Sequence, residues 1–296
     1  MISQKTGISW TDSTLNAVVG CTLVSDGCLR CYANRLVTIN RGNVFRKPFD
    51  EPDIRLERLQ QLRKLGPIRE TDGSVRPRMI FTNSISDIFW EKVPDDVIHK
   101  QLDAFESHPR TVFQLLSKRP IRARKILTDR YGNSGVPANL WIGFSVEQNQ
   151  VAARLNVLRS IKERTGGSMT AFVSVEPLIG PSDQIDFTGI DWTILGGESG
   201  PGARIMQREW LLDALGNAEK AGSRIWLKQH GQMRSHPNLS EAPDHWKITE
   251  RFKWLIENGW EVLQDEKGGA TCDKQTWRDL PLAYDQLKAR MNDSLI

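Results

Sequence analysis

The stretch Thr170-Ala-Phe-Val-Ser-Val-Glu-Pro177 joins a short apolar run to a polar tail. The run would place apolar residues on both faces of an extended chain, as strands of a parallel sheet covered on both sides do. Five other stretches have the same form: 78–83, 111–116, 140–145, 192–196 and 224–228. Amphipathic segments separate these stretches, at 95–107, 121–129, 147–164 and 207–221. Because strand and helix alternate, we predict an α/β protein with a parallel sheet.

Polar residues follow every predicted strand at the same point of the repeating unit. They lie at 83–87, 117–119, 145–147, 174–177, 196–200 and 228–230. In a parallel barrel the carboxyl ends of the strands form one mouth, and the active site lies there. We therefore predict a partial (β/α) barrel, TIM-like, of about six or seven strands, with an added C-terminal helical segment near 280–291. Residues 1–231 would form the barrel-type domain with the cysteine loop, and 232–296 a C-terminal extension packed on the barrel.

The composition limits the class of protein and its partners. The chain has 296 residues and a formal net charge of +4. This mild positive charge permits an anionic partner such as DNA or RNA without requiring one. No apolar run approaches the roughly 18 residues that a membrane helix needs, and residues 1–10 contain no apolar signal core. We therefore expect a cytoplasmic protein without membrane association.

Three of the four cysteines lie close together, at Cys21, Cys28 and Cys31, and the fourth is Cys272. In a reducing compartment, clustered cysteines indicate metal binding or catalysis rather than disulfides. Three thiolates fit three corners of a [4Fe–4S] cluster and leave one iron open. A structural zinc site, with Cys272 or a histidine as fourth ligand, is an alternative, although such sites usually have two paired half-sites. Free structural cysteines are the third alternative.

The chain resembles a phage- and bacteria-borne three-Cys-motif family of poorly assigned function. The matching blocks extend from residue 8 to about residue 231 and are Trp10-Thr-Asp12, Asn16, Gly20-Cys21, Gly27-Cys28, Cys31-Tyr-Ala33, Asn83-Ser-Ile-Ser-Asp87, Lys118-Arg-Pro120, Ser145-Val-Glu147, Ser174-Val-Glu-Pro-Leu178, Gly196-Gly-Glu-Ser-Gly-Pro-Gly202, Arg204 and Lys228-Gln229. That family is distantly similar to radical S-adenosylmethionine enzymes, nearest to spore photoproduct lyase.

The resemblance implies that the three cysteines hold a [4Fe–4S] cluster at the start of a partial barrel, with S-adenosylmethionine at the fourth iron. In such enzymes reductive cleavage of this cofactor yields a radical that abstracts hydrogen from the substrate. The chain departs from the usual motif in the spacing of its first two cysteines, which six residues separate here instead of three. It also has Arg30, and not an aromatic residue, before the third cysteine.

Several residues after the predicted strands are candidates for cofactor binding and catalysis. By position after the predicted strand at 78–83, Asn83, Ser84, Ser86 and Asp87 would bind the amino group of the cofactor. Gly196 and Gly197 have the backbone freedom to approach a ligand, unless they form a plain βα turn. Glu147, Glu176, Glu198 and Lys228 would bind the cofactor or transfer protons. Alternatively, each carboxylate pairs with a local arginine.

The cations of the same rim suggest a phosphate-bearing substrate. They are Lys118, Arg119, Arg204 and Lys228, with Tyr32 beside the cysteines as a further contact. The first hypothesis is therefore a radical-type enzyme that repairs or modifies nucleic acid or a nucleotide. The alternative is a non-catalytic, zinc- or cluster-stabilised nucleic-acid-binding protein that acts with a protein partner. A metal-dependent hydrolase that uses the glutamates is the third hypothesis.

Overall fold

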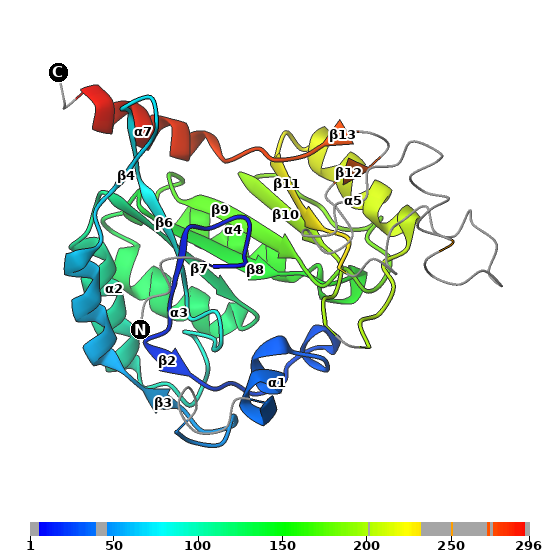
Figure 1. Ribbon diagram of the computed structural model, residues 1–296, viewed down its shortest axis with the longest axis horizontal. Coiled ribbons are helices and arrows are strands. Elements are labelled where there is room, and N and C mark those ends of the chain that lie inside the picture. Colours follow the sequence, from blue (N-terminus) through cyan, green and yellow to red (C-terminus); the bar gives the residue numbers. More distant parts are fainter. Residues whose placement is uncertain are drawn as a thin grey trace. The chain divides into compact units, whose positions relative to one another are not determined.

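Seven parallel strands form the main sheet, in the order β1-β6-β7-β8-β9-β10-β11 (Figure 1). This computed structural model describes residues 6–39, 46–200, 202–231, 250, 271–272 and 275–293. The strands are β1 (Ser13–Leu15), β6 (Arg78–Thr82), β7 (Thr111–Ser117), β8 (Leu140–Ser145), β9 (Thr170–Val175), β10 (Trp192–Gly196) and β11 (Arg224–Gln229). The predicted α/β class with a parallel sheet is confirmed.

Helices lie between most of these strands, as predicted, although none lies between β9 and β10 in the described residues 176–191. They are α1 (Tyr32–Ile39), α2 (Asp95–Glu106), α3 (Pro120–Tyr131), α4 (Arg154–Arg164), α5 (Arg208–Lys220) and α7 (Leu282–Asp293). Three 3₁₀ helices add to them: η1 (Asp26–Cys28), η2 (Leu56–Lys64) and η3 (Asn149–Val151). The predicted C-terminal helix is therefore present as α7. Among the described residues, no helix has both the length and the apolar character needed to cross a bilayer.

Three two-stranded antiparallel pairs complete the described secondary structure. They are β2 (Val18–Val19) with β3 (Asp53–Ile54), β4 (Ile68–Arg69) with β5 (Val75–Arg76), and β12 (Thr271–Cys272) with β13 (Gln275–Thr276). In the first pair, β2 comes just before the cysteines in the chain and β3 comes after them.

The chain divides into two compact units. The first comprises Met1–Phe144, Asn156–Phe172 and Pro281–Ile296, and the second comprises Ser145–Leu155 and Val173–Leu280. The predicted boundary at residue 231 stays a prediction, because most of 232–270 lies outside the described residues.

Aromatic packing fills the core of the first unit on one face of its strands. The Trp10 ring lies 4.7 Å from the Phe81 ring and 6.5 Å from the Phe172 ring, centroid to centroid. Gly143, within β8, makes room for this packing, because a Cβ there would lie 2.6 Å from the Phe172 ring. The apolar runs that predict the strands are therefore buried in a close-packed interior.

Helix α7 is bound to the first unit through the β5 strand. The Asn292 amide donates to the Val75 carbonyl at 2.7 Å and accepts from the Val75 N–H at 2.8 Å. Arg76 makes a two-pronged ion pair with Asp12, at 2.8 and 2.9 Å, and its guanidinium lies 3.4 Å from the Tyr284 hydroxyl. The C-terminal helix is thus an integral part of the first unit.

Candidate functional site

The cysteine loop leaves the β2 strand through Gly20, and only glycine fits there. Its φ is +101°, and a Cβ would lie 2.7 Å from the Glu51 carbonyl oxygen and 2.8 Å from that of Phe49. The Gly20 N–H donates to the Ile85 carbonyl at 3.2 Å, and the Cys21 N–H donates to the Phe49 carbonyl at 2.7 Å. The backbone therefore holds Cys21 beside the segment that follows β6.

Cys28 and Cys31 lie one turn apart where the chain enters helix α1. The Cys31 N–H donates to the Cys28 carbonyl at 3.1 Å, and the Cys31 carbonyl accepts from the Arg35 N–H at 3.1 Å. Cys31 also packs on a small apolar cluster that contains Val19 and Ala33. All three cysteines of the loop are free thiols and half-buried. The 3₁₀ turn η1 and the start of α1 thus bring the second and third cysteines onto one short rigid segment.

The donor set of this loop fits thiolate ligation. Burial raises the pKa of the Cys21 thiol to about 11, nearby Asp87 adds to the increase, and Arg119 opposes it. Cys28 makes a smaller contribution that also raises the Cys21 pKa. Metal binding would displace the Cys21 proton. As the side chains stand, no group of three Cys, His, Asp or Glu residues in the described part converges on a metal position. The side chain of Cys272 lies outside the described residues.

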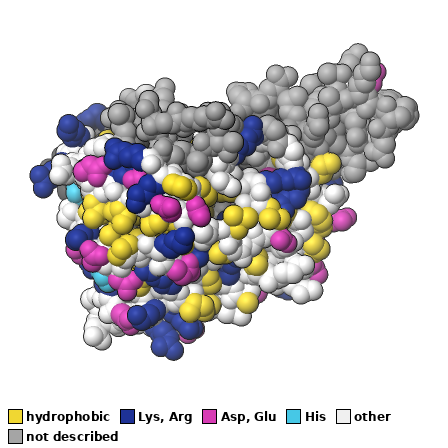
Figure 2. Space-filling model, turned by 90° about the horizontal axis from the view of Figure 1, so that it is seen from below, with side chains coloured by type: hydrophobic (Ala, Val, Ile, Leu, Met, Phe, Trp, Pro, Cys, Tyr) yellow, Lys and Arg dark blue, Asp and Glu magenta, His cyan; other side chains and the backbone are white. Residues whose placement is uncertain are grey.

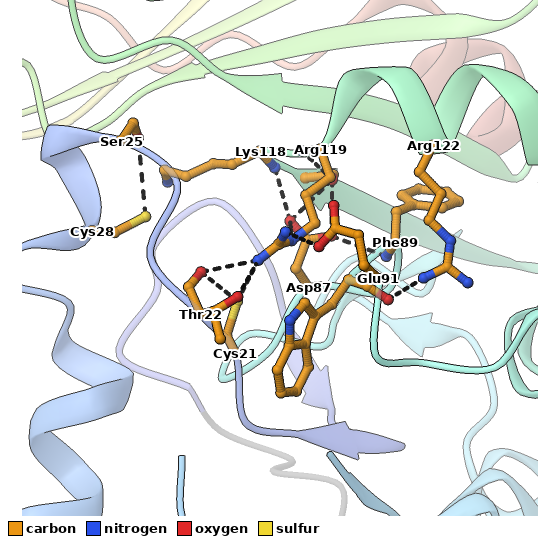
Figure 3. A network of polar contacts seen from close by, with 12 residues as sticks. Cys21, Thr22, Ser25, Cys28, Asp87, Phe89, Glu91, Lys118, Arg119 and Arg122 are labelled. Carbon is orange, nitrogen blue, oxygen red and sulfur yellow. Dashed lines mark hydrogen bonds and ion pairs between the residues drawn. The ribbon is translucent and has the colours of Figure 1, made fainter. Parts of the chain in front are cut away.

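Arg119 links the cysteine loop to the end of strand β7 (Figure 3). Its guanidinium donates to the Thr22 carbonyl at 3.0 Å and to the Thr22 hydroxyl at 2.9 Å. The same terminal nitrogen lies 3.9 Å from the Cys21 sulfur. Arg119 also forms ion pairs with Glu91 and, at 4.0 Å, with Asp87. The predicted phosphate-binding arginine is thus buried, and it contacts the loop that carries the first cysteine.

Asp87 is buried and accepts hydrogen bonds from three residues. The Ser117 hydroxyl donates to its carboxylate at 2.8 and 3.0 Å, and the Lys118 N–H donates at 2.9 Å. The Phe89 N–H donates at 3.0 Å. Burial raises the pKa of the Asp87 carboxyl, while the N–H of Lys118, the Ser117 hydroxyl and the N–H of Phe89 oppose the increase. This carboxylate joins the ends of β6 and β7 in the first unit.

The other predicted cofactor residues after β6 contact residues of the same unit that are distant in the sequence. The Asn83 side chain accepts from the Val18 N–H at 3.1 Å and donates to Gln101 at 2.9 Å. The Ser84 hydroxyl donates to the Asn16 side chain at 3.2 Å. The Tyr32 hydroxyl donates to the Ser84 carbonyl. The Ser86 hydroxyl is buried and has no hydrogen-bond partner among the described residues. Cofactor binding by these residues stays a prediction.

Each of the three predicted glutamates forms an ion pair within the second unit. The pairs are Glu147 with Arg154, Glu176 with Lys228, and Glu198 with Arg204. Glu147 and Glu198 therefore each pair with a nearby arginine, which is the alternative that the sequence left open. Arg154 was not identified from the sequence as the partner of Glu147. Its position only seven residues after Glu147, near the start of a helix, could have indicated this pairing.

The three pairs differ in how far water reaches them. The Glu147 side chain is 1% exposed, and Arg154 donates to its carboxylate at 2.9 Å and to the Ser145 carbonyl at 2.7 Å. The Glu198 carboxylate accepts from the Arg204 backbone at 2.8 Å and from its guanidinium at 3.0 and 2.5 Å. The Glu176 side chain, by contrast, is 18% exposed. Glu176 is therefore the most accessible of the three carboxylates.

The glycines after β10 allow close approach of the β11 backbone. A Cβ at Gly197 would lie 2.1 Å from the His230 carbonyl oxygen, and the Gly197 N–H donates to the Gln229 carbonyl at 3.0 Å. A Cβ at Gly196 would lie 3.5 Å from the Glu176 carboxyl carbon. Gly197 is thus required by backbone packing, and Gly196 lies beside the Glu176–Lys228 pair.

The structure places the predicted site residues in two sets. The first unit contains Cys21, Cys28, Cys31, Tyr32, Asn83, Ser84, Ser86, Asp87, Lys118 and Arg119, and the second contains Glu147, Glu176, Gly196, Gly197, Glu198, Arg204 and Lys228. Thr22 and Glu91, which contact Arg119, were missed, because nothing local in the sequence identifies them as its partners.

The chain belongs to the DUF5131 family, which is described as a family of proteins of unknown function and matches residues 5–281. No curated protein and no solved structure matches the chain. The match covers all of the predicted site residues.

Proposed function

We propose that this member of the DUF5131 family is an iron–sulfur enzyme of the radical S-adenosylmethionine type, built on a TIM-like partial barrel and acting on nucleic acid or a nucleotide. The observation that carries the proposal is the place of the cysteine loop. The loop follows β1 with only the short β2 strand between them, and the Gly20 N–H donates to the Ile85 carbonyl after the neighbouring β6. A ligand loop at the carboxyl end of the first strand supports the similarity to enzymes of this type.

The three clustered cysteines are the proposed ligands. Cys21 is held by its backbone, and Cys28 and Cys31 lie one turn apart at the entry to α1. A [4Fe–4S] cluster bound by three thiolates would supply an electron and an open iron position for the cofactor. Asn83 and Asp87 follow β6, on either side of Ile85, whose carbonyl accepts from the Gly20 N–H. This position beside the start of the cysteine loop supports their assignment to the cofactor site.

The Glu176–Lys228 pair is the proposed reactive pair of the second unit. Its carboxylate is more exposed than that of Glu147, and its partner is a lysine, which lacks the planar fork of an arginine. A lysine–carboxylate pair can exchange partners when a cationic ligand arrives or when a proton moves. Glu147 and Glu198 are clasped by arginines and are proposed to fix the turns after β8 and β10.

Contact with a base is the proposed role of Tyr32. Tyr32 is 48% exposed as a residue while its hydroxyl is bound to the Ser84 carbonyl, so the side chain is accessible and also anchored. Aromatic rings held in this way stack on bases of single strands. On the face drawn in Figure 2, basic side chains are interspersed with acidic and hydrophobic ones rather than gathered in one patch. We therefore expect only a few phosphate contacts.

The second candidate is a zinc- or cluster-stabilised nucleic-acid-binding protein that acts with a protein partner. The observation that favours it is the exposure of apolar side chains on the cysteine segment, at Leu23, Val24, Leu29, Tyr32 and Leu36. Exposed apolar surface of this kind is typical of interaction sites.

Turnover separates the two candidates. The anaerobically reconstituted protein is incubated with S-adenosylmethionine and dithionite, and 5′-deoxyadenosine and methionine are measured by mass spectrometry. The proposal predicts both products with the wild type, none with Cys28→Ala, and a large loss with Glu176→Gln. A protein that binds DNA or RNA but yields neither product would support the second candidate.

A further inference from the structure

We infer that Arg119 is a positioning residue for Cys21: it fixes the first cysteine's loop and places a positive charge beside its sulfur. The inference rests on the proposed role of Cys21 as a cluster ligand. It gives Arg119 a different role from the phosphate contact that the sequence predicts. The reasons are its contacts, its burial and the distance to the sulfur.

The contacts of Arg119 reach the loop directly beside the first ligand. Its terminal nitrogen donates to both the carbonyl and the hydroxyl of Thr22, at 3.0 and 2.9 Å. Thr22 follows Cys21, so these two bonds hold the backbone next to the ligand. With the Cys21 N–H bound to the Phe49 carbonyl at 2.7 Å, the cysteine is fixed on both sides.

The charge of Arg119 is held in place by carboxylates and by burial. Its side chain is 5% exposed and pairs with Glu91 and with Asp87. Asp87 is itself fixed by the Ser117 hydroxyl and the Lys118 N–H. A guanidinium that is buried and paired in this way is not available to a phosphate in solution. Its planar fork does, however, remain 3.9 Å from the Cys21 sulfur.

A fixed charge at this distance affects a bound cluster in two ways. Groups that orient metal ligands typically change metal affinity by about 10- to 100-fold when they are replaced. Charge and hydrogen bonds near the sulfurs also set the potential of an iron–sulfur cluster. Because reduction adds negative charge, the Arg119 cation stabilises the reduced form and raises the midpoint potential.

The test compares three variants of the full chain with the wild type. Arg119→Ala removes both the anchor and the charge, and Arg119→Lys keeps the charge but not the fork. Arg122→Ala is the matched control, since Arg122 lies in α3, three residues after Arg119, and is bound to the Val93 carbonyl and to Asp95. None of its described contacts involves the cysteine loop.

Hydrogen exchange of the metal-free protein tests the anchor. The inference predicts faster amide exchange at residues 21–25 in both Arg119 variants, with no change there in Arg122→Ala. Equal exchange at these residues in the wild type and in Arg119→Ala would overturn the inference, whether or not the protein binds iron.

Two titrations of the reconstituted protein test the effect on the cluster. In a titration with an iron chelator, Arg119→Ala should lose iron at about 10- to 100-fold lower chelator concentration than the wild type. An electrochemical titration then measures the effect of the charge on the midpoint potential of the cluster. The midpoint potential of Arg119→Ala should be more negative, while Arg119→Lys stays close to the wild-type potential and Arg122→Ala matches it. A potential that is the same in all four proteins would overturn the charge effect. A wild type without iron and sulfide would refute the proposed function instead, and the exchange measurement would then decide on the anchor alone.

Discussion

Replacing Glu147 by glutamine should destabilise the protein without removing a reactive group. The Glu147 side chain is 1% exposed, and the side chain of Arg154 beside it is 10% exposed. Glutamine has almost the same shape but no charge, so it leaves the buried Arg154 guanidinium without its counter-ion. Loss of one partner of a buried ion pair lowers the free energy of unfolding by about 3 kcal/mol. For a chain of this length that corresponds to a fall in Tm of about 5 °C.

Glu176→Gln is the matched comparison, because it makes the same chemical change at the Glu176–Lys228 pair. Both side chains of this pair are partly exposed, 18% for Glu176 and 13% for Lys228, so water compensates part of the lost attraction. We expect Glu176→Gln to lower the free energy of unfolding by about 1 kcal/mol or less and to change Tm by about 2 °C at most. Cofactor cleavage should show the opposite order, with the larger loss in Glu176→Gln.

Thermal unfolding followed by circular dichroism measures the first effect, and product formation per folded protein measures the second. Glu147→Gln should have the lower Tm and near wild-type turnover at a temperature where it is folded. An unchanged Tm in Glu147→Gln, or a greater fall in Tm with Glu176→Gln, would refute the reasoning from burial. Equal loss of turnover in both variants would refute the division between a structural and a reactive glutamate.

The remaining predictions concern the cysteine loop and the nucleic acid. Gly20→Ala should lower the free energy of unfolding by about 2 kcal/mol, because alanine is strained at the positive φ of this position and its Cβ would overlap backbone oxygens. Gly66→Ala is the control, because a Cβ at Gly66 meets nothing within 4 Å, and it should leave the urea midpoint of unfolding unchanged. Equal midpoints would contradict the close approach at Gly20. Binding of single-stranded DNA or RNA should weaken with salt by about 0.7 log units per phosphate contact per decade. Lys118→Ala should flatten the dependence of this binding on salt, and Tyr32→Ala should lower the affinity at every salt concentration. A wild type that binds neither polymer at low salt would exclude DNA and RNA as substrates.

The sequence predicts the main strands well because their burial is continuous. The stretches 140–145, 170–175 and 192–196 match β8, β9 and β10, since each is apolar over its whole length and is covered on both faces. Strand β1 was missed because it has only three residues and begins with Ser13 and Thr14. It is a strand because it pairs in parallel with β6, which is distant in sequence.

The site shows the same limit of sequence reasoning. The cysteine trio and the residues after each strand can be found from local patterns. The contact of Arg119 with Thr22 joins positions 97 residues apart and depends on how β7 meets the cysteine loop. The pairing of Glu176 with Lys228 spans 52 residues and joins the ends of β9 and β11, which β10 separates in the sheet. No local pattern encodes such contacts, since they arise only when the strands are assembled.

Metal and sulfide analysis of the anaerobically purified protein and of four cysteine variants tests directly whether three cysteines hold an iron–sulfur cluster. We expect a brown wild type with iron and acid-labile sulfide in near-equal amounts. Iron should be lost in Cys21→Ala, Cys28→Ala and Cys31→Ala and retained in Cys272→Ala. A colourless wild type that contains zinc, or an equal loss of metal in all four variants, would contradict an open cluster held by three cysteines.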